Sequence, residues 1–513
     1  MILKSICTSA LLLSLAQAAP QPVSFFPEAP MVNEIPDFKA DNYAEVNKKW
    51  KASSRKIASD FSESSLSDDF KNKLRKQWLE TTTADGVFQL LVQSRKDYAK
   101  YSPDVQYFLT QMHTMIPLKG IVWRLRPIFE AGGLFKGNKA THMSAIQFVR
   151  TAVTGLSAAF PTSQTDAMIA YFTQPGPEMS EKSQFKTVAE FQNFLVDSYI
   201  PYLFESVKNI DALLKNYSEA KGRPQAEMVW DNQMFFGTGS FRDGFNRYVG
   251  HGPAEMHIAM ALGWEAIHDA YVFSSYNQDD LVNVAGRLGR AFGIDALKSD
   301  SNDIGLTDKE RAKIIASYTS KGFLSLRKNR DPKAKGDEGY GKRNMKLALP
   351  AKRQSVNHFN QAYIKLEGKG SNSSMAINPA LYQKDIQNRL NAGVSKMVSA
   401  MDGVTEFKDP MSSEVITINV PAFYNEPPQS LAILMANDWE GGESTKSITS
   451  TSGEQLKYRN YFSGRAKSWN NNAWAKYVTS ASGQKADYMM TAKRIMHYSP
   501  GATVLGAVDL FVR

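Results

Sequence analysis

Residues 247–273, RYVGHGPAEMHIAMALGWEAIHDAYVF, contain the pattern that decides the fold. Gly252-Pro253 is typical of a helix start, because proline suits the first helical position. Apolar residues then recur at helical spacing to the end of the stretch. The pattern predicts a core helix with His251 at its entrance and Glu255 in its first turn.

The entrance of this predicted helix is a candidate anion site. The unpaired N–H groups of a first helical turn attract anions, and Arg247 just upstream adds positive charge. Glu255 follows His251 by four residues, a spacing at which a carboxylate can reach an imidazole. A buried core helix with polar residues at its end explains the same pattern equally well.

The first residues, 1–18, have the form of a secretory signal peptide. They contain one lysine, an apolar run too short to span a bilayer and an Ala-Gln-Ala cleavage pattern. We therefore expect a secreted or periplasmic protein. The only cysteine, Cys7, lies inside this peptide, so the mature chain has no thiol for a disulfide, a metal site or catalysis.

The rest of the chain predicts a mainly α protein with a helical-bundle domain, 19–324, followed by a smaller α+β domain, 354–513. In the first domain we expect helices near 39–60, 65–80, 84–98, 103–115, 140–158, 163–172, 187–217, 253–273, 278–293 and 307–324. In the second we expect helices near 378–402 and 485–497 and strands within 414–423, 430–435 and 503–512.

A basic stretch, 325–353, separates the two predicted domains. From Arg327 to Arg353 it contains ten Lys or Arg residues against three Asp or Glu residues, and its proline and glycines disfavour a helix. We interpret it as a solvated linker that could make peripheral contact with an anionic membrane surface. Nucleic acid is not expected as a partner, because no recognition motif accompanies the charge.

The histidines do not predict a metal site. Glu265 and His268 form one Glu-x-x-His pair on the predicted core helix, but a di-iron bundle needs a second such pair, which the chain lacks. The usual signatures of zincins and serine hydrolases are also missing. We therefore expect no metal.

Two upstream segments add cations and hydroxyls. Lys119 and Arg126 are seven residues apart, which on one helix is two turns and places both on one face, where they could clamp a phosphate. Ser163 and Gln164 follow a proline turn at the start of another predicted helix, a second candidate oxyanion cradle.

In order along the chain, these three segments resemble the motifs of the type 2 phosphatidic acid phosphatase and vanadium haloperoxidase superfamily. The family's Lys-x6-Arg-Pro motif matches at Lys119, Arg126 and Pro127. Its Pro-Ser-Gly-His motif is altered here to Pro-Thr-Ser-Gln, with Gln164 in the place of histidine. Its third motif, Ser-Arg-x5-His-x3-Asp, is matched in part at His251.

In this third motif Glu255 replaces the aspartate and Arg247 precedes His251 by four residues instead of six. The resemblance covers roughly residues 119–263.

The resemblance implies a phosphatase that hydrolyses phosphate monoesters through a phosphohistidine. His251 would be the nucleophile and Glu255 would hold its ring, while Lys119, Arg126 and Arg247 would neutralise the phosphoryl group. The substrate would be a phosphorylated small molecule or a phospholipid head group. No resident cofactor is expected, and vanadate chemistry is disfavoured by the missing histidine.

Gln164 cannot protonate a leaving group, a loss that typically costs about a hundred- to ten-thousand-fold in rate. Two alternatives therefore stay open. One is a non-catalytic pseudoenzyme or binding protein for an anionic ligand. The other treats the motifs as accidental and assigns a structural or surface-interaction role, with the function in 354–513.

Overall fold

The structure is a computed structural model that describes residues 61–131, 162–219, 228–231, 248–279, 322, 324–330, 339–366, 384–408, 415–431, 438–439, 445–449, 455–459, 466–468, 473 and 475–480. Within these residues the protein is mainly α, with small sheets of two or three strands. The fold class predicted from the sequence is confirmed. In this part of the chain no helix is long and apolar enough to cross a bilayer.

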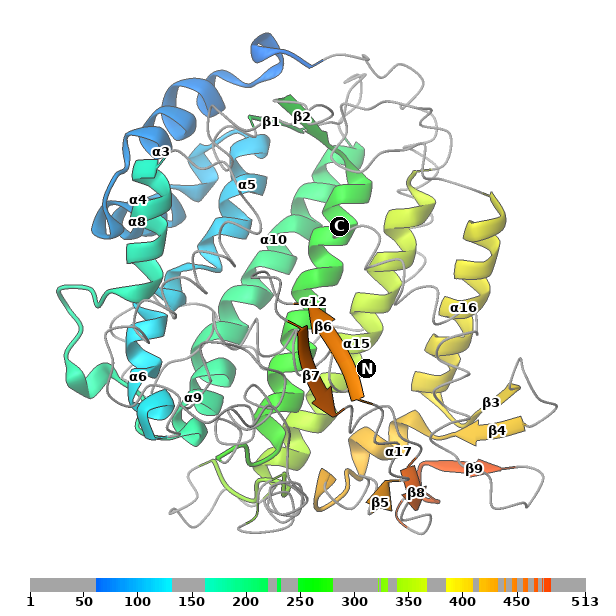
Figure 1. Cartoon of the computed structure of the whole chain (residues 1–513). Coiled ribbons are helices and arrows are strands. Elements are labelled where there is room, and N and C mark those ends of the chain that lie inside the picture. The colour runs from blue at the N-terminus through cyan, green and yellow to red at the C-terminus, as the bar shows by residue number, and fades with distance from the viewer. Residues whose placement is uncertain are drawn as a thin grey trace.

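The N-terminal helices form one side of the helical body (Figure 1). The longer ones are α4 (Ala84–Lys96), α5 (Pro103–His113), α6 (Ile121–Ala131), α8 (Thr162–Thr173) and α9 (Val188–Phe194). Shorter segments are η2 (Glu63–Ser65), the π-helix η3 (Phe70–Arg75), α3 (Lys76–Glu80), η4 (Tyr98–Lys100), η5 (Ile116–Leu118), η6 (Glu181–Ser183) and the π-helix η7 (Leu195–Tyr199). The helices expected at 39–60 and 140–158 lie outside the described residues, and those at 278–293 and 307–324 lie almost wholly outside them.

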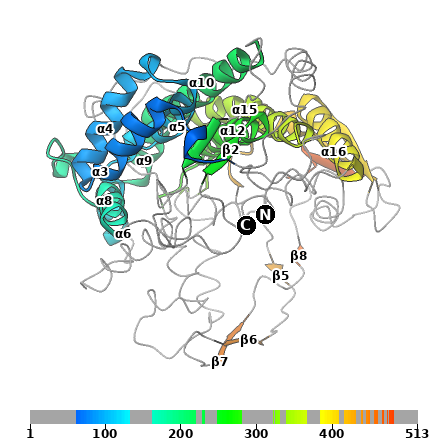
Figure 2. The same ribbon diagram turned by 90° about the horizontal axis from the view of Figure 1, so that it is seen from above.

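Three long helices run side by side through the middle of the molecule (Figures 1 and 2). They are α10 (Ile200–Glu219), α12 (Pro253–Ser275) and α15 (Tyr340–Ile364). Small residues let them approach closely: a Cβ added at Gly263 of α12 would lie only 2.5 Å from Val207 of α10. Helix α12 is apolar around most of its circumference, as expected of a helix surrounded by protein.

Helix α15 overturns the prediction of a solvated linker for the second half of 325–353. Residues 340–353 form its first half, and Pro350 lies within the helix. Ala348 and Ala351 are completely buried in the same hydrophobic core as the N-terminal helices. Lys342, Arg343 and Lys346 of this stretch are exposed, while the alanines point into the core, so helical periodicity outweighs the high local charge.

The first basic residue of the stretch, Arg327, is buried and completes the C-terminal end of α12. Its guanidinium donates to the carbonyl oxygen of Ser274 at 3.3 Å, and its backbone N–H donates to that of Ser275 at 2.9 Å. The last carbonyls of a helix have no partner within the helix and carry partial negative charge, so a cation with several donors stabilises them. This arginine is therefore structural.

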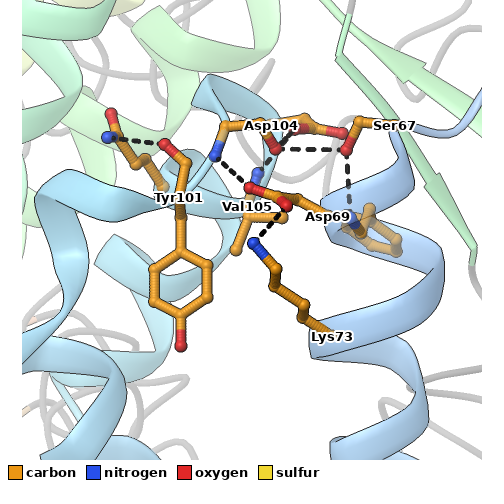
Figure 3. A network of polar contacts seen from close by, with 9 residues as sticks. Ser67, Asp69, Lys73, Tyr101, Asp104 and Val105 are labelled. Atoms are coloured by element: carbon orange, nitrogen blue, oxygen red, sulfur yellow. Dashed lines mark hydrogen bonds and ion pairs between the residues drawn. The ribbon is translucent and has the colours of Figure 1, made fainter.

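A polar network fixes the start of α5, the helix that later contributes Tyr107 to the candidate site (Figure 3). The backbone N–H of Ser102 donates to Asp69 at 3.0 Å, and Lys73 pairs with the other oxygen of Asp69 at 2.6 Å. Hydrogen bonding from Lys73 lowers the pKa of Asp69. Asp104 accepts from the N–H of Val105 at 2.9 Å. These contacts satisfy first-turn donors that the helix itself leaves unpaired.

Two short strands lead into α12. Strand β1 (Met228–Asp231) pairs antiparallel with β2 (Tyr248–His251), so that His251 lies opposite Met228. Glycine and proline at positions 252 and 253 then end the strand and begin the helix, as the sequence predicts. The helix starts at the expected residue and ends two residues later than expected.

The C-terminal part contains α16 (Lys384–Asp402), α17 (Val420–Asn425) and the sheet β3 (Thr405–Lys408), β4 (Val415–Ile418) and β9 (Val478–Ser480). Two-stranded sheets are formed by β5 (Asp438–Trp439) with β8 (Ala466–Ser468) and by β6 (Thr445–Thr449) with β7 (Gln455–Arg459).

The strand predicted within 414–423 ends at Ile418, because the side chain of Asn419 accepts from the N–H of Ala422 at 3.0 Å and caps α17. The elements predicted at 485–497 and 503–512 lie outside the described residues, as does most of 430–435.

Candidate functional site

His251 is held between aromatic rings at the junction of β2 and α12. Its ring stacks on Trp230 with centroids 3.8 Å apart, and Tyr107 of α5 meets it edge-on at 5.7 Å. Burial lowers the pKa of His251 to about 3, so the imidazole is neutral at physiological pH. Among the described residues, its Nδ1 atom has no hydrogen-bond partner.

Glu255 caps α12. Its carboxylate accepts from the backbone N–H of Gly252 at 2.8 Å, which satisfies a donor at the helix start. The resemblance implied that Glu255 would hold the ring of His251, but within the described part of the chain the Nδ1 of His251 is unbonded. Glu255 stabilises the helix start instead of orienting that nitrogen.

Lys119 is almost completely buried and is compensated by two carboxylates. Its ammonium pairs with Asp85 at 2.7 Å and with Glu178 at 3.6 Å, and it lies 4.2 Å from the ring centroid of Phe88. Because these two carboxylates compensate the charge of the ammonium group, Lys119 would attract a phosphate only weakly. The role implied for Lys119 by the family resemblance therefore has no support in this geometry.

Lys119 and Arg126 are not on one helix, so that expectation is wrong. Lys119 follows η5, Gly120 has a φ of 64°, and α6 begins only at Ile121. The left-handed turn at Gly120 separates the lysine from the helix that carries Arg126. Arg126 itself is exposed. The two cations do not form the predicted two-turn clamp.

Ser163 and Gln164 lie in the first turn of α8, and their side chains lie outside what the structure describes. Lys119 is not part of α8 but lies beside its C-terminal end. The N–H of the next residue, Gly120, donates to the carbonyl oxygen of Tyr171 at 2.8 Å. A twelve-residue helix is about 18 Å long at about 1.5 Å per residue, so these predicted motifs are not adjacent.

Helix α6, which follows Lys119, is also well separated in both views from β2, the strand that ends at His251 (Figures 1 and 2). Arg247 lies outside the described residues. The described members of the predicted phosphate site therefore do not meet in one place.

A different polar cluster lies in the middle of α12, where the helix faces α15 and α17. The Nδ1 atom of His268 is 2.9 Å from Asp269 Oδ1 and 4.0 Å from Glu265 Oε1. The donor atoms of these three side chains all lie within 4.8 Å of one another. We call these three residues the α12 cluster.

Two residues from other helices complete the surroundings of the α12 cluster. Lys352 of α15 forms an ion pair with Glu265, and the hydroxyl of Tyr424 in α17 lies 2.9 Å from His268 Nε2. Burial alone would raise the pKa of Glu265, but the charges of Lys352 and His268 outweigh it and lower this pKa. Burial, with the nearby carboxylates, raises the pKa of Tyr424, which stays protonated.

Sequence reasoning found only part of the α12 cluster. The spacing of Glu265 and His268 was visible, but Lys352 and Tyr424 join them from positions 87 and 156 residues away in the chain. Asp269 is the signal in the sequence for a third possible ligand, because it is a carboxylate directly after the histidine. The lack of a second Glu-x-x-His motif argues against a di-iron bundle but not against a site for a single ion.

Comparison of the chain with protein-family models, with curated proteins and with solved structures finds no match. The interpretation of the sites therefore depends on their chemistry.

Proposed function

We propose that the protein is a non-catalytic binding protein for an anionic ligand and that this ligand is the head-group layer of an anionic membrane. In this proposal the chain acts outside the cytoplasm, secreted or periplasmic, as its first residues suggest. The observation that carries the proposal is a group of exposed lysines at the N-terminal end of α15: Lys328, Lys342 and Lys346. We call this group the α15 basic face.

The fold brings Lys328 to this group although it precedes the helix. The N–H groups of Gly339 and Tyr340 donate to the carbonyl oxygen of Lys328 at 2.8 and 3.1 Å, so that Lys328 lies beside the first turn of α15. Arg343 lies on the same turn, 5.0 Å from the ring centroid of Tyr340. Lysine ammonium groups on one exposed face attract anionic lipids through their combined field.

The strength of this attraction can be estimated. Each Lys or Arg close to an anionic membrane contributes about 1 kcal/mol at physiological ionic strength. Three lysines together would contribute about 3 kcal/mol, which corresponds to roughly a hundredfold in the partition constant. The contribution should fall as salt is added, because the interacting charges are exposed.

The test compares sedimentation of the protein with vesicles of phosphatidylcholine alone and of phosphatidylcholine mixed with phosphatidylserine. We expect binding only to the mixed vesicles and a roughly hundredfold loss in the triple variant Lys328→Gln, Lys342→Gln, Lys346→Gln. The matched control, Lys76→Gln, Lys186→Gln, Lys208→Gln, removes the same net charge from other exposed positions and should bind almost as well as the wild type. Equal binding by the two triple variants would refute the proposed face.

A second candidate, the phosphohistidine phosphatase, is favoured by one observation at His251. A nucleophilic imidazole must be neutral and must have a free nitrogen, and His251 meets both conditions within the described structure. Lys119 would take no part in this version of the mechanism.

The phosphatase candidate is tested by phosphate release from p-nitrophenyl phosphate and from phosphatidic acid. Activity in the wild type that is lost in His251→Ala and retained in Lys119→Gln would support it. No release by the wild type would remove this candidate and leave the binding proposal.

A further inference from the structure

The α12 cluster combines the donor types of a metal site with partial access to solvent. Its side chains come from positions i, i+3 and i+4 of one helix, which bring them to the same surface. The side chains of Glu265, His268 and Asp269 are 33%, 11% and 20% exposed, so an ion can reach them from solvent. The site therefore lies at the edge of the core, between α12 and its neighbours.

The distances are close to those that one ion requires. Zinc bonds to imidazole nitrogen and carboxylate oxygen are about 2.1 Å long, so two donors of one ion lie at most about 4.2 Å apart. The separations of 2.9 and 4.0 Å from His268 Nδ1 meet this limit, and no pair exceeds 4.8 Å. A small side-chain rotation would bring the widest pair within this limit.

We propose that Glu265, His268 and Asp269 bind one divalent transition-metal ion. The donor set of one imidazole and two carboxylates suits Zn²⁺ or Mn²⁺ better than Cu⁺, which prefers sulfur, or Mg²⁺, which prefers oxygen alone. Three protein donors leave at least one coordination position for water or for an anionic oxygen ligand.

Tyr424 supports this assignment as a positioning residue. A histidine that binds a metal through one nitrogen usually has its other nitrogen held by a hydrogen bond that fixes the ring. The oxygen of the Tyr424 hydroxyl lies 2.9 Å from Nε2 and can accept a hydrogen bond from the Nε2–H group. In that tautomer the lone pair of Nδ1 is directed to the side where Asp269 and Glu265 present their oxygens.

Lys352 makes the proposal testable by a gain of affinity. Its ammonium pairs with Glu265 Oε1, the carboxylate oxygen closest to His268 Nδ1, and so competes with a metal ion for that oxygen. The pair also shows that this carboxylate already attracts a cation in the fold. Replacing Lys352 by glutamine removes the competing charge and leaves both carboxylates available, so metal affinity should rise.

The experiment is calorimetric titration of the untagged, chelator-treated full chain with Zn²⁺. We expect one saturable site in the wild type, at least about tenfold tighter binding by Lys352→Gln and at least about tenfold weaker binding by His268→Gln and by Asp269→Asn. Asp402→Asn is the matched control, since Asp402 pairs with the α15 cation Arg353 but is not in the α12 cluster. Its affinity should equal that of the wild type.

Far-UV circular dichroism of each variant separates lost binding from lost folding. The expected gain in Lys352→Gln cannot arise from misfolding, so it tests the site even if His268→Gln is unstable. Absence of a saturable site in both the wild type and Lys352→Gln would overturn the proposal. So would wild-type affinity in folded His268→Gln.

Discussion

The pH dependence of stability should reveal a buried pair of histidines between α12 and α15. The Nδ1 atoms of His257 and His358 lie 3.0 Å apart, and both side chains are buried. Burial, helped by the mutual proximity of the two rings and by Lys365, lowers the pKa of His257 well below its ordinary value. Burial also lowers the pKa of His358 to about 4. Both rings are therefore neutral in the folded protein down to mildly acidic pH.

The sign and size of the effect follow from proton linkage. Histidine in the unfolded chain has a pKa of about 6.5. Above this pH the imidazoles are neutral in both states and contribute no pH dependence. Below it, the unfolded state binds protons that the folded state cannot, so the free energy of unfolding falls by about 1.4 kcal/mol per pH unit for each histidine. At about pH 5.5 the pair should therefore have lost about 2.8 kcal/mol.

Urea unfolding between about pH 7.5 and about pH 5.5 measures the loss for the whole chain, to which the buried imidazoles of His113 and His251 also contribute, so the share of the pair is read from the difference between the wild type and a variant. The variant His358→Gln retains a hydrogen-bonding side chain but removes one titrating group. Below a pH of about 6, the slope of its free energy of unfolding against pH should therefore be smaller than that of the wild type by about 1.4 kcal/mol per pH unit. Asn357→Gln, at the neighbouring and partly exposed position, is the control and should keep the wild-type slope. Equal slopes for His358→Gln and the wild type would show that His358 is protonated in the folded state and would refute the reasoning.

Other variants test single contacts. Gly341→Ala should lower the stability by about 1 to 3 kcal/mol, because its Cβ would collide with backbone atoms at the end of α12 that cannot move aside; thermal unfolding measures this, and an unchanged midpoint would contradict it. Glu255→Ala should cost about 1 kcal/mol through loss of the cap on Gly252, which urea unfolding would detect, while a loss near zero would mean that water replaces the cap. Tyr424→Phe should weaken Zn²⁺ binding by about ten- to a hundredfold in the same calorimetric titration, and unchanged affinity would exclude its positioning role.

The helices were the most predictable part of the fold. Helix α12 was expected at 253–273 and is found at Pro253–Ser275, because glycine and proline mark its start and its apolar pattern is continuous. The helix expected at 84–98 is found as α4, with Thr83 accepting from the N–H of Gly86 at its start. In both cases the signal is local, since it depends on residues within one or two helical turns.

Features that depend on a single backbone turn could not be predicted from spacing alone. Seven residues between Lys119 and Arg126 suggested one helical face, but the left-handed Gly120 lies between them. A Cβ at this position would lie 2.9 Å from the carbonyl oxygen of Gln174, so the close approach of the loop after α8 also requires glycine. That approach comes from residues about fifty positions further along the chain, which no local pattern contains.

The distribution of cations shows why charge counts along a sequence are a poor guide to ligand binding. Lys119, Arg327 and Lys352 each lie beside carboxylates or helix carbonyls of the protein itself, so much of their charge is already compensated. Lys342 and Lys346 belong to the same basic stretch as Arg327 and Lys352, yet they face solvent. The net charge of +10 therefore overstates what a ligand would meet. Binding should depend on the few exposed cations that share one face, and only the folded arrangement of α12 and α15 identifies them.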